Sequence, residues 1–174
     1  MGLENPIKEY KDLWFDYPKL QARSERVKGV LGMHERIDFL IVNSRPCSGQ
    51  FRAYDSTEYL TPLILELAER YSVAVTQPLY IENSGGHRPA ATSVACTMDY
   101  NLSISEIGAL SLHADNLIMV STGPSWPTFN VWNANRVRLR LLMLENEIID
   151  YMPNLVQVAS REAARSVLRE RGFL

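Results

Sequence analysis

Two polar, glycine-containing loops carry residue types that bind phosphate groups. The second of them reads Ser-Thr-Gly-Pro-Ser-Trp and comprises Ser121, Thr122, Gly123, Pro124, Ser125 and Trp126. The first follows the apolar run at residues 37–42 and offers Ser44, Ser48, Gly49 and Gln50, together with Arg45 and Arg52. Hydroxyl groups, guanidinium groups and backbone N–H groups at a glycine turn donate hydrogen bonds to phosphate oxygens. Each loop alone is equally well explained by the backbone needs of a turn, so it is the pair that predicts an anion site.

Short apolar runs alternate with helical patterns along the chain and would position both loops. Strands are predicted at residues 37–42, 72–77, 93–98, 117–122, 137–144 (with one partly exposed face) and 155–158. Helices are predicted at residues 58–71, 104–114, 128–135 and 160–174, the second opening with the capping-box spacing of Ser103 and Glu106. This alternation favours a mostly parallel sheet with right-handed crossovers and helices on both faces.

The predicted architecture is therefore a Rossmann-like, three-layer α/β domain over residues 36–174, preceded by a helical extension over residues 1–35. The extension contains Trp14, Phe15 and Tyr17 in a charged background, which is typical of a helix that packs on the sheet or on a partner. Ligands of open α/β sheets bind beyond the carboxyl ends of the strands, where both polar loops are expected.

The segment from Asp99 to Trp126 resembles the donor-binding half of GT-B glycosyltransferases, most closely the heptosyltransferase-like (family 9) group. The pattern of that group is an Asp-Leu loop, a Ser-Leu-x-Glu helix start, a helix that ends near Ala-Asp, an apolar strand and a Thr-Gly-Pro turn. In this sequence they fall at Asp99, Ser103 with Glu106, Ala114 with Asp115, residues 117–121 and 122–124. Residues 37–50 are more loosely similar to the first strand and donor-facing loop of the same domain.

The resemblance implies that a nucleotide-sugar donor binds here as a substrate, with no cofactor and no metal. Its diphosphate would contact Thr122, Gly123, Pro124 and Ser125, and its nucleoside would contact residues 102–104, namely Leu102, Ser103 and Ile104. Ser121 stands where the family usually has Asp, and Trp126 stands where His is common. A GT-B enzyme has two such domains, and this chain has room for the C-terminal one, so a second domain or subunit would supply the acceptor site and the base.

Composition, charge and motifs argue against several other functional classes of protein. The 174 residues carry 18 Lys and Arg against 20 Asp and Glu, which gives no basic face for nucleic acid. Cys47 and Cys96 form neither a disulfide framework nor a zinc-ligand spacing, so a cytoplasmic protein is expected. No apolar run is long enough to predict a membrane span. The motifs of serine hydrolases, P-loop NTPases and dinucleotide oxidoreductases are missing from the sequence.

The remaining candidate residues have ordinary structural explanations. His34, His87 and His113 are not spaced as metal ligands, and His113 suits the end of a helix. Trp126 is either a base-stacking or a core residue.

Two functional hypotheses follow. The first is a nucleotide-sugar binding domain that takes part in hexosyl or heptosyl transfer when paired with a partner domain or as a homo-oligomer. The alternative is a non-catalytic Rossmann-like module that binds a partner protein or a phosphorylated metabolite.

Overall fold

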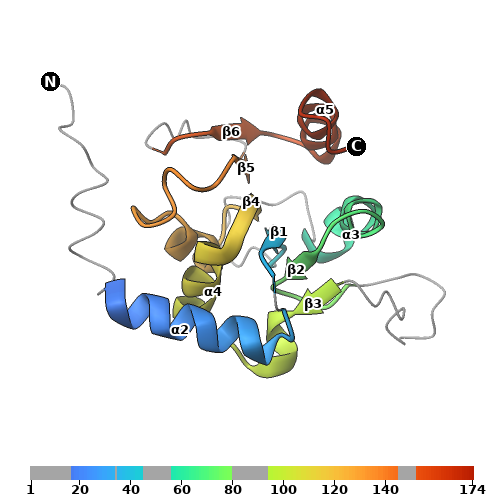
Figure 1. Ribbon diagram of the computed structural model, residues 1–174. Coiled ribbons are helices and arrows are strands. Elements are labelled where there is room, and N and C mark those ends of the chain that lie inside the picture. Colours follow the sequence, from blue (N-terminus) through green and yellow to red (C-terminus); the bar gives the residue numbers. More distant parts are fainter. Residues whose placement is uncertain (1–16, 34, 45–55, 80–93, 145–151) are drawn as a thin grey trace, which may run out of the picture.

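A six-stranded, all-parallel sheet forms the centre of the molecule. The computed structural model describes residues 17–33, 35–44, 56–79, 94–144 and 152–174 (Figure 1). The strands are β1 (Ile37–Val42), β2 (Val73–Val75), β3 (Val94–Cys96), β4 (Ala114–Val120), β5 (Leu139–Met143) and β6 (Leu155–Val158). Their order across the sheet is β3-β2-β1-β4-β5-β6, and each neighbouring pair is parallel. The predicted Rossmann-like fold is confirmed.

Helices cover both faces of this sheet (Figure 1). The α-helices are α2 (Tyr17–Val30), α3 (Ser56–Ala68), α4 (Ile104–Leu110) and α5 (Arg161–Glu170), and the short 3₁₀ helices are η1 (Thr97–Tyr100), η2 (Ser111–His113) and η3 (Gly123–Thr128). Helix α4 packs against α2 and η3 on one face, while α3 packs against α5 on the other. Right-handed crossovers put α3 and α4 on opposite faces, because the chain passes from β1 outward to β2 through α3 and returns from β3 to β4 through α4.

The two central strands are mostly apolar and buried because helices cover them on both sides, and their only partly exposed residues are Asp38 in β1 and Asp115 in β4. Phe39 in β1 is fully buried, and its ring makes edge-to-face contacts with Tyr71 and Phe173 at centroid distances of 5.3 and 5.1 Å. Phe173 follows α5 near the end of the chain, so the C-terminal segment closes the core over β1.

Helix α2 belongs to the helical layer beside α4. Its Leu20 packs with Ala109 and Leu112, and Trp132 covers this small cluster. Helix α2 also contacts η2, where His113 Nε2 lies 3.1 Å from the Ser24 hydroxyl oxygen. The expected helix in the N-terminal extension is thus present over residues 17–30 and packs within the chain, whereas Trp14 and Phe15 lie outside the described residues.

Two local predictions were wrong. No α-helix forms over residues 128–135. The helical turn is η3, which starts earlier, at Gly123, and turns follow it over residues 131–136. Side-chain amides compete with a helical backbone here: Asn133 Nδ2 donates to the Thr128 carbonyl oxygen at 2.9 Å, and Asn130 Nδ2 donates to the Pro127 carbonyl oxygen at 3.1 Å.

The second wrong prediction is the partly exposed face of the strand expected over residues 137–144. Strand β5 has no exposed face. All five of its residues are buried, including Arg140. The guanidinium donates to the carbonyl oxygens of Asn133, Ala134 and Pro153 and to Asn133 Oδ1, at distances between 2.7 and 3.2 Å. Four oxygen acceptors therefore replace water around this buried cation.

Candidate functional site

The strand order reverses between β1 and β4, and the two polar loops begin on either side of that reversal. Val42, the last residue of β1, is in register with Met119 of β4. The chain beyond β1, Asn43 and Ser44, therefore emerges beside the chain beyond β4, at Ser121. In doubly wound sheets the crevice at such a reversal is the usual ligand-binding position. The structure thus brings together the starts of the two loops that the sequence singled out.

On the β4 side, the turn at residues 122–125 is held by its own hydroxyl groups. The Ser125 hydroxyl donates to the Val120 carbonyl oxygen and lies 3.4 Å from Thr122 Oγ1. Ser125 N–H donates to the Thr122 carbonyl oxygen at 2.9 Å, and Pro124 has no N–H to offer. Among the described residues, the N–H groups of Thr122 and Gly123 are then the backbone donors of this turn that have no protein acceptor assigned.

Gly123 is the exposed residue of this turn. Thr122 and Ser125 are buried, Pro124 is half-buried, and a Cβ placed on Gly123 would meet no atom within 4 Å. The backbone at Gly123 is consequently open to close approach by a ligand. The fold itself makes no steric demand for glycine at this position.

On the β1 side, a buried amide ties the carboxyl ends of β1 and β2 together. Asn43 Oδ1 accepts from Thr76 N–H at 3.0 Å and from Gln77 N–H at 2.8 Å, and its Nδ2 donates to the Gln77 carbonyl oxygen at 3.1 Å. The Ser44 hydroxyl pairs with Thr76 Oγ1 at 3.0 Å. Sequence reasoning named Ser44 and missed the clamp made by Asn43, although an Asn directly after a buried strand was a signal for it.

The start of α4 is the third part of the predicted site. Because α4 follows β3 and leads back to the start of β4, its N-terminus lies at the carboxyl end of the sheet. Ser103 caps it in the predicted way: Glu106 N–H donates to Ser103 Oγ, and Ser103 N–H donates to Glu106 Oε2 at 2.8 Å. Ser103 and Ile104 are exposed and Leu102 is half-buried. The Ser103 backbone and hydroxyl donors lower the pKa of Glu106, which also pairs with Arg26.

Trp126 belongs to the core more than to an open binding surface. Its ring is half-buried, lies 5.7 Å from the Phe129 ring and packs against the main hydrophobic cluster.

Several residues that the sequence singled out lie outside the described residues, namely His34, Arg45, Ser48, Gly49, Gln50, Arg52 and His87. Among the residues that the structure does describe, no group of three or more His, Cys, Asp or Glu side chains is arranged to hold a metal ion.

Comparisons with family models, with curated proteins and with solved structures found no match to this chain. In the described part of the chain, no helix combines the length and the apolar character needed to cross a membrane.

Proposed function

We propose that this chain binds the diphosphate of a nucleotide sugar where the carboxyl ends of β1 and β4 meet, as the donor-binding domain of a GT-B-type glycosyltransferase. The observation that carries the proposal is the reversal of strand order between β1 and β4, which puts Asn43 and Ser44, the described start of the first loop, beside the start of the Thr-Gly-Pro turn. A partner domain or subunit would supply the acceptor site and the base.

The expected contribution to catalysis is electrostatic. Gly123 N–H would stabilise the charge that develops on the diphosphate leaving group, in a geometry fixed before reaction. Residues 43–44 and 121–126, the described ends of the two loops, contain no acidic or basic side chain. This part of the site is suited to binding, and proton transfer would depend on groups from elsewhere.

Two observations favour the alternative of a non-catalytic module that binds a partner protein or a phosphorylated metabolite. The Ser125 hydroxyl is buried and donates inward to the Val120 carbonyl oxygen, so it is already used by the fold. The turn is also a 3₁₀ helix, so it presents fewer outward N–H groups than the start of a full α-helix.

The experiment is thermal denaturation of the purified chain against UDP, GDP, ADP, CMP and their sugar conjugates. A ligand at about 100 times its dissociation constant adds about 2.7 kcal/mol to the free energy of unfolding. For a domain of this size that corresponds to a rise in Tm of about 5–10 °C. A selective rise with one nucleotide supports the proposal and identifies the base.

Gly123→Val places a branched side chain where the diphosphate would lie, and it is expected to abolish this rise. Gly29→Val is the matched control, because Gly29 is equally uncrowded but lies in α2. No rise with any nucleotide, or an undiminished rise in Gly123→Val, would contradict nucleotide binding at this turn. A stable complex with another protein and no nucleotide response would favour the alternative.

A further inference from the structure

Helix α2 is attached to the rest of the molecule along one face. Its main neighbours are α4 and η2, and it lies at the edge of the molecule (Figure 1). The buried face carries Leu20, Ser24 and Val27, followed by Leu31 just beyond the helix, at the spacing of one helix side. Ser24 places a buried hydroxyl group within this apolar stripe. The attachment of α2 therefore includes a polar contact as well as apolar packing.

The partner of Ser24 is His113, a titratable side chain that is only 9% exposed. His113 Nε2 lies 3.1 Å from Ser24 Oγ, and the Ser24 hydroxyl donates to the Gln21 carbonyl oxygen at 2.7 Å. Because the hydroxyl proton is used in that bond, His113 Nε2 is the donor to Ser24 Oγ. The neutral ring thus carries its proton on Nε2, and acidification adds a second proton at Nδ1.

The charged groups around His113 do not compensate for this second proton. Glu25 Oε1 on α2 lies 3.6 Å from Nε2 and favours the charged ring, but the Glu25 side chain is 58% exposed, so water screens it. Lys28 on α2, Arg36 before β1 and Arg136 before β5 oppose the added charge. Burial has the largest effect, and it lowers the pKa of His113. Packing of α2 therefore favours the neutral ring.

The other polar contacts of α2 contribute little to its attachment. Arg26 pairs with Glu106 at the start of α4, and the Arg26 side chain is largely exposed. Arg23 Nη1 donates to Ser105 Oγ at 2.9 Å, also at the surface. Exposed pairs of this kind are weak. These properties are typical of an element that opens locally before the core unfolds.

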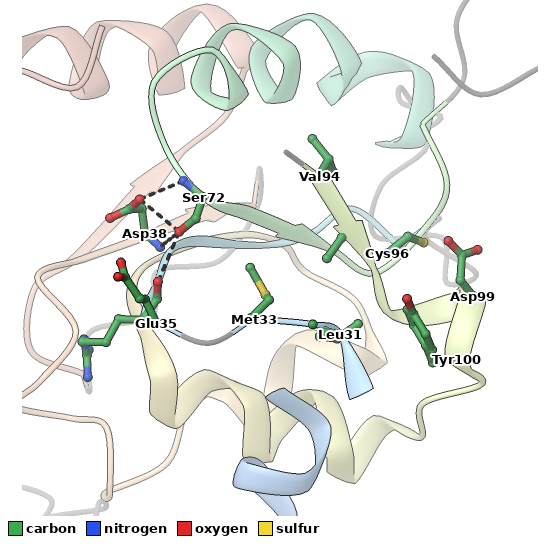
Figure 2. A pocket seen from close by; sticks show the side chains of 12 residues that line it. Leu31, Met33, Glu35, Asp38, Ser72, Val94, Cys96, Asp99 and Tyr100 are labelled. Atoms are coloured by element: carbon green, nitrogen blue, oxygen red, sulfur yellow. Dashed lines mark hydrogen bonds between the residues drawn. The ribbon is translucent and has the colours of Figure 1, made fainter. Parts of the chain in front are cut away.

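Packing is also incomplete where α2 ends. Leu31 and Met33, which follow the helix, line a cavity of about 760 Å³ that extends to Val94 and Ala95 of β3 (Figure 2). Side chains beside a cavity have fewer atoms to contact than side chains in a filled core. The C-terminal end of α2 is therefore less firmly held than the strands of the sheet.

We propose that His113 is a pH-sensitive switch for α2: when the ring gains its second proton, α2 separates from α4 and η2 while the sheet stays folded. Separation returns the charged ring to water. It also exposes Ala109, Leu112 and Trp132, the apolar side chains that pack with Leu20. This switch is independent of nucleotide binding.

The test is hydrogen–deuterium exchange of the full chain between about pH 7.5 and about pH 5.5, with rates expressed relative to the intrinsic exchange rate at each pH. Amides of α2 are expected to lose protection as pH falls below about 6.5, by up to about tenfold per pH unit, because the separated ring binds the proton more tightly. Amides of β1 and β4 should keep their protection. Protection of α2 that does not change with pH, or an equal loss in β1 and β4, overturns the proposal.

Two variants are expected to change this pH response in opposite directions. His113→Gln keeps an N–H donor for Ser24 but stays neutral, so the pH response of α2 should disappear. Glu25→Gln removes the carboxylate that favours the charged ring, so the response should become larger. Glu69→Gln is the control, because it removes the same charge from an exposed position beyond the end of α3.

A pH response that persists in His113→Gln would show that another group binds the proton, and the proposal would be refuted. If His113→Gln instead loosens α2 at every pH, the comparison of Glu25→Gln with Glu69→Gln decides. A larger response in Glu25→Gln alone supports the switch, and equal responses in both variants contradict it.

Discussion

Arg140 gives the sharpest test of how this fold is stabilised, because it is a fully buried cation that donates to carbonyl and amide oxygens and to no carboxylate of the described residues. Its two terminal nitrogens donate four hydrogen bonds to oxygens of Asn133, Ala134 and Pro153. Burial lowers the pKa of Arg140 to about 10, which still leaves the guanidinium charged at neutral pH. The side chain thereby ties β5 to the turn before it and to the turn before β6.

Arg140→Met keeps most of the side-chain volume and leaves these buried oxygens without their donor. Each unsatisfied buried group costs about 1–3 kcal/mol, partly offset because the cation no longer has to be desolvated. We expect a loss of about 3–5 kcal/mol from the free energy of unfolding. This is a large share of the roughly 5–15 kcal/mol typical of a domain, and it corresponds to a fall in Tm of about 10 °C.

Urea denaturation followed by circular dichroism measures this loss directly. Arg138→Met is the matched control, because Arg138 lies two residues earlier and is exposed, so its replacement should stay within about 0.5 kcal/mol of the parent protein. If Arg140→Met is as stable as Arg138→Met, the four hydrogen bonds contribute no net stability and the explanation given for the buried strand is refuted.

Three further changes test other contacts. Ser103→Ala removes the cap of α4 and should lower the free energy of unfolding by about 1 kcal/mol in urea denaturation. Ser103 also lowers the pKa of Glu106, so this stabilisation is present above the ordinary glutamate pKa and is lost as pH falls below it. The variant should therefore lose less stability than the parent protein on acidification. Burial lowers the pKa of His113, although Glu25 opposes this, so the fold should lose stability as pH falls below about 6.5 and His113→Gln should flatten that dependence in Tm measurements. Phe173→Ala should lower the unfolding free energy by about 2 kcal/mol in the same urea assay, because it removes the ring contact with Phe39.

The sequence was sufficient to predict the strands and the fold class. Parallel strands that are buried on both faces are continuous apolar runs, and residues 37–42 coincide with β1. The cap at Ser103 was also predictable, because its partner Glu106 is only three residues away. Such features depend on neighbours in sequence, which periodicity and spacing describe well.

The errors arose where partners are distant in sequence or compete with the backbone. Arg138 and Arg140 suggested an alternating strand with one wet face, but the acceptors that allow Arg140 to be buried include the Pro153 carbonyl oxygen, 13 residues away. The helix expected over residues 128–135 failed because Asn130 and Asn133 bond to nearby backbone carbonyls. Neither arrangement has a periodic signature.

For the candidate site, the sequence predicted that both loops lie at the carboxyl edge of the sheet but not how their polar atoms are used. Both loops follow strands, so the rule for parallel sheets placed them at one edge. Whether they are adjacent depended on the strand order, which short apolar runs do not specify. The structure adds that Ser44 and Ser125 hydrogen-bond within the protein, so the exposed backbone at Gly123 is the stronger candidate for ligand contact.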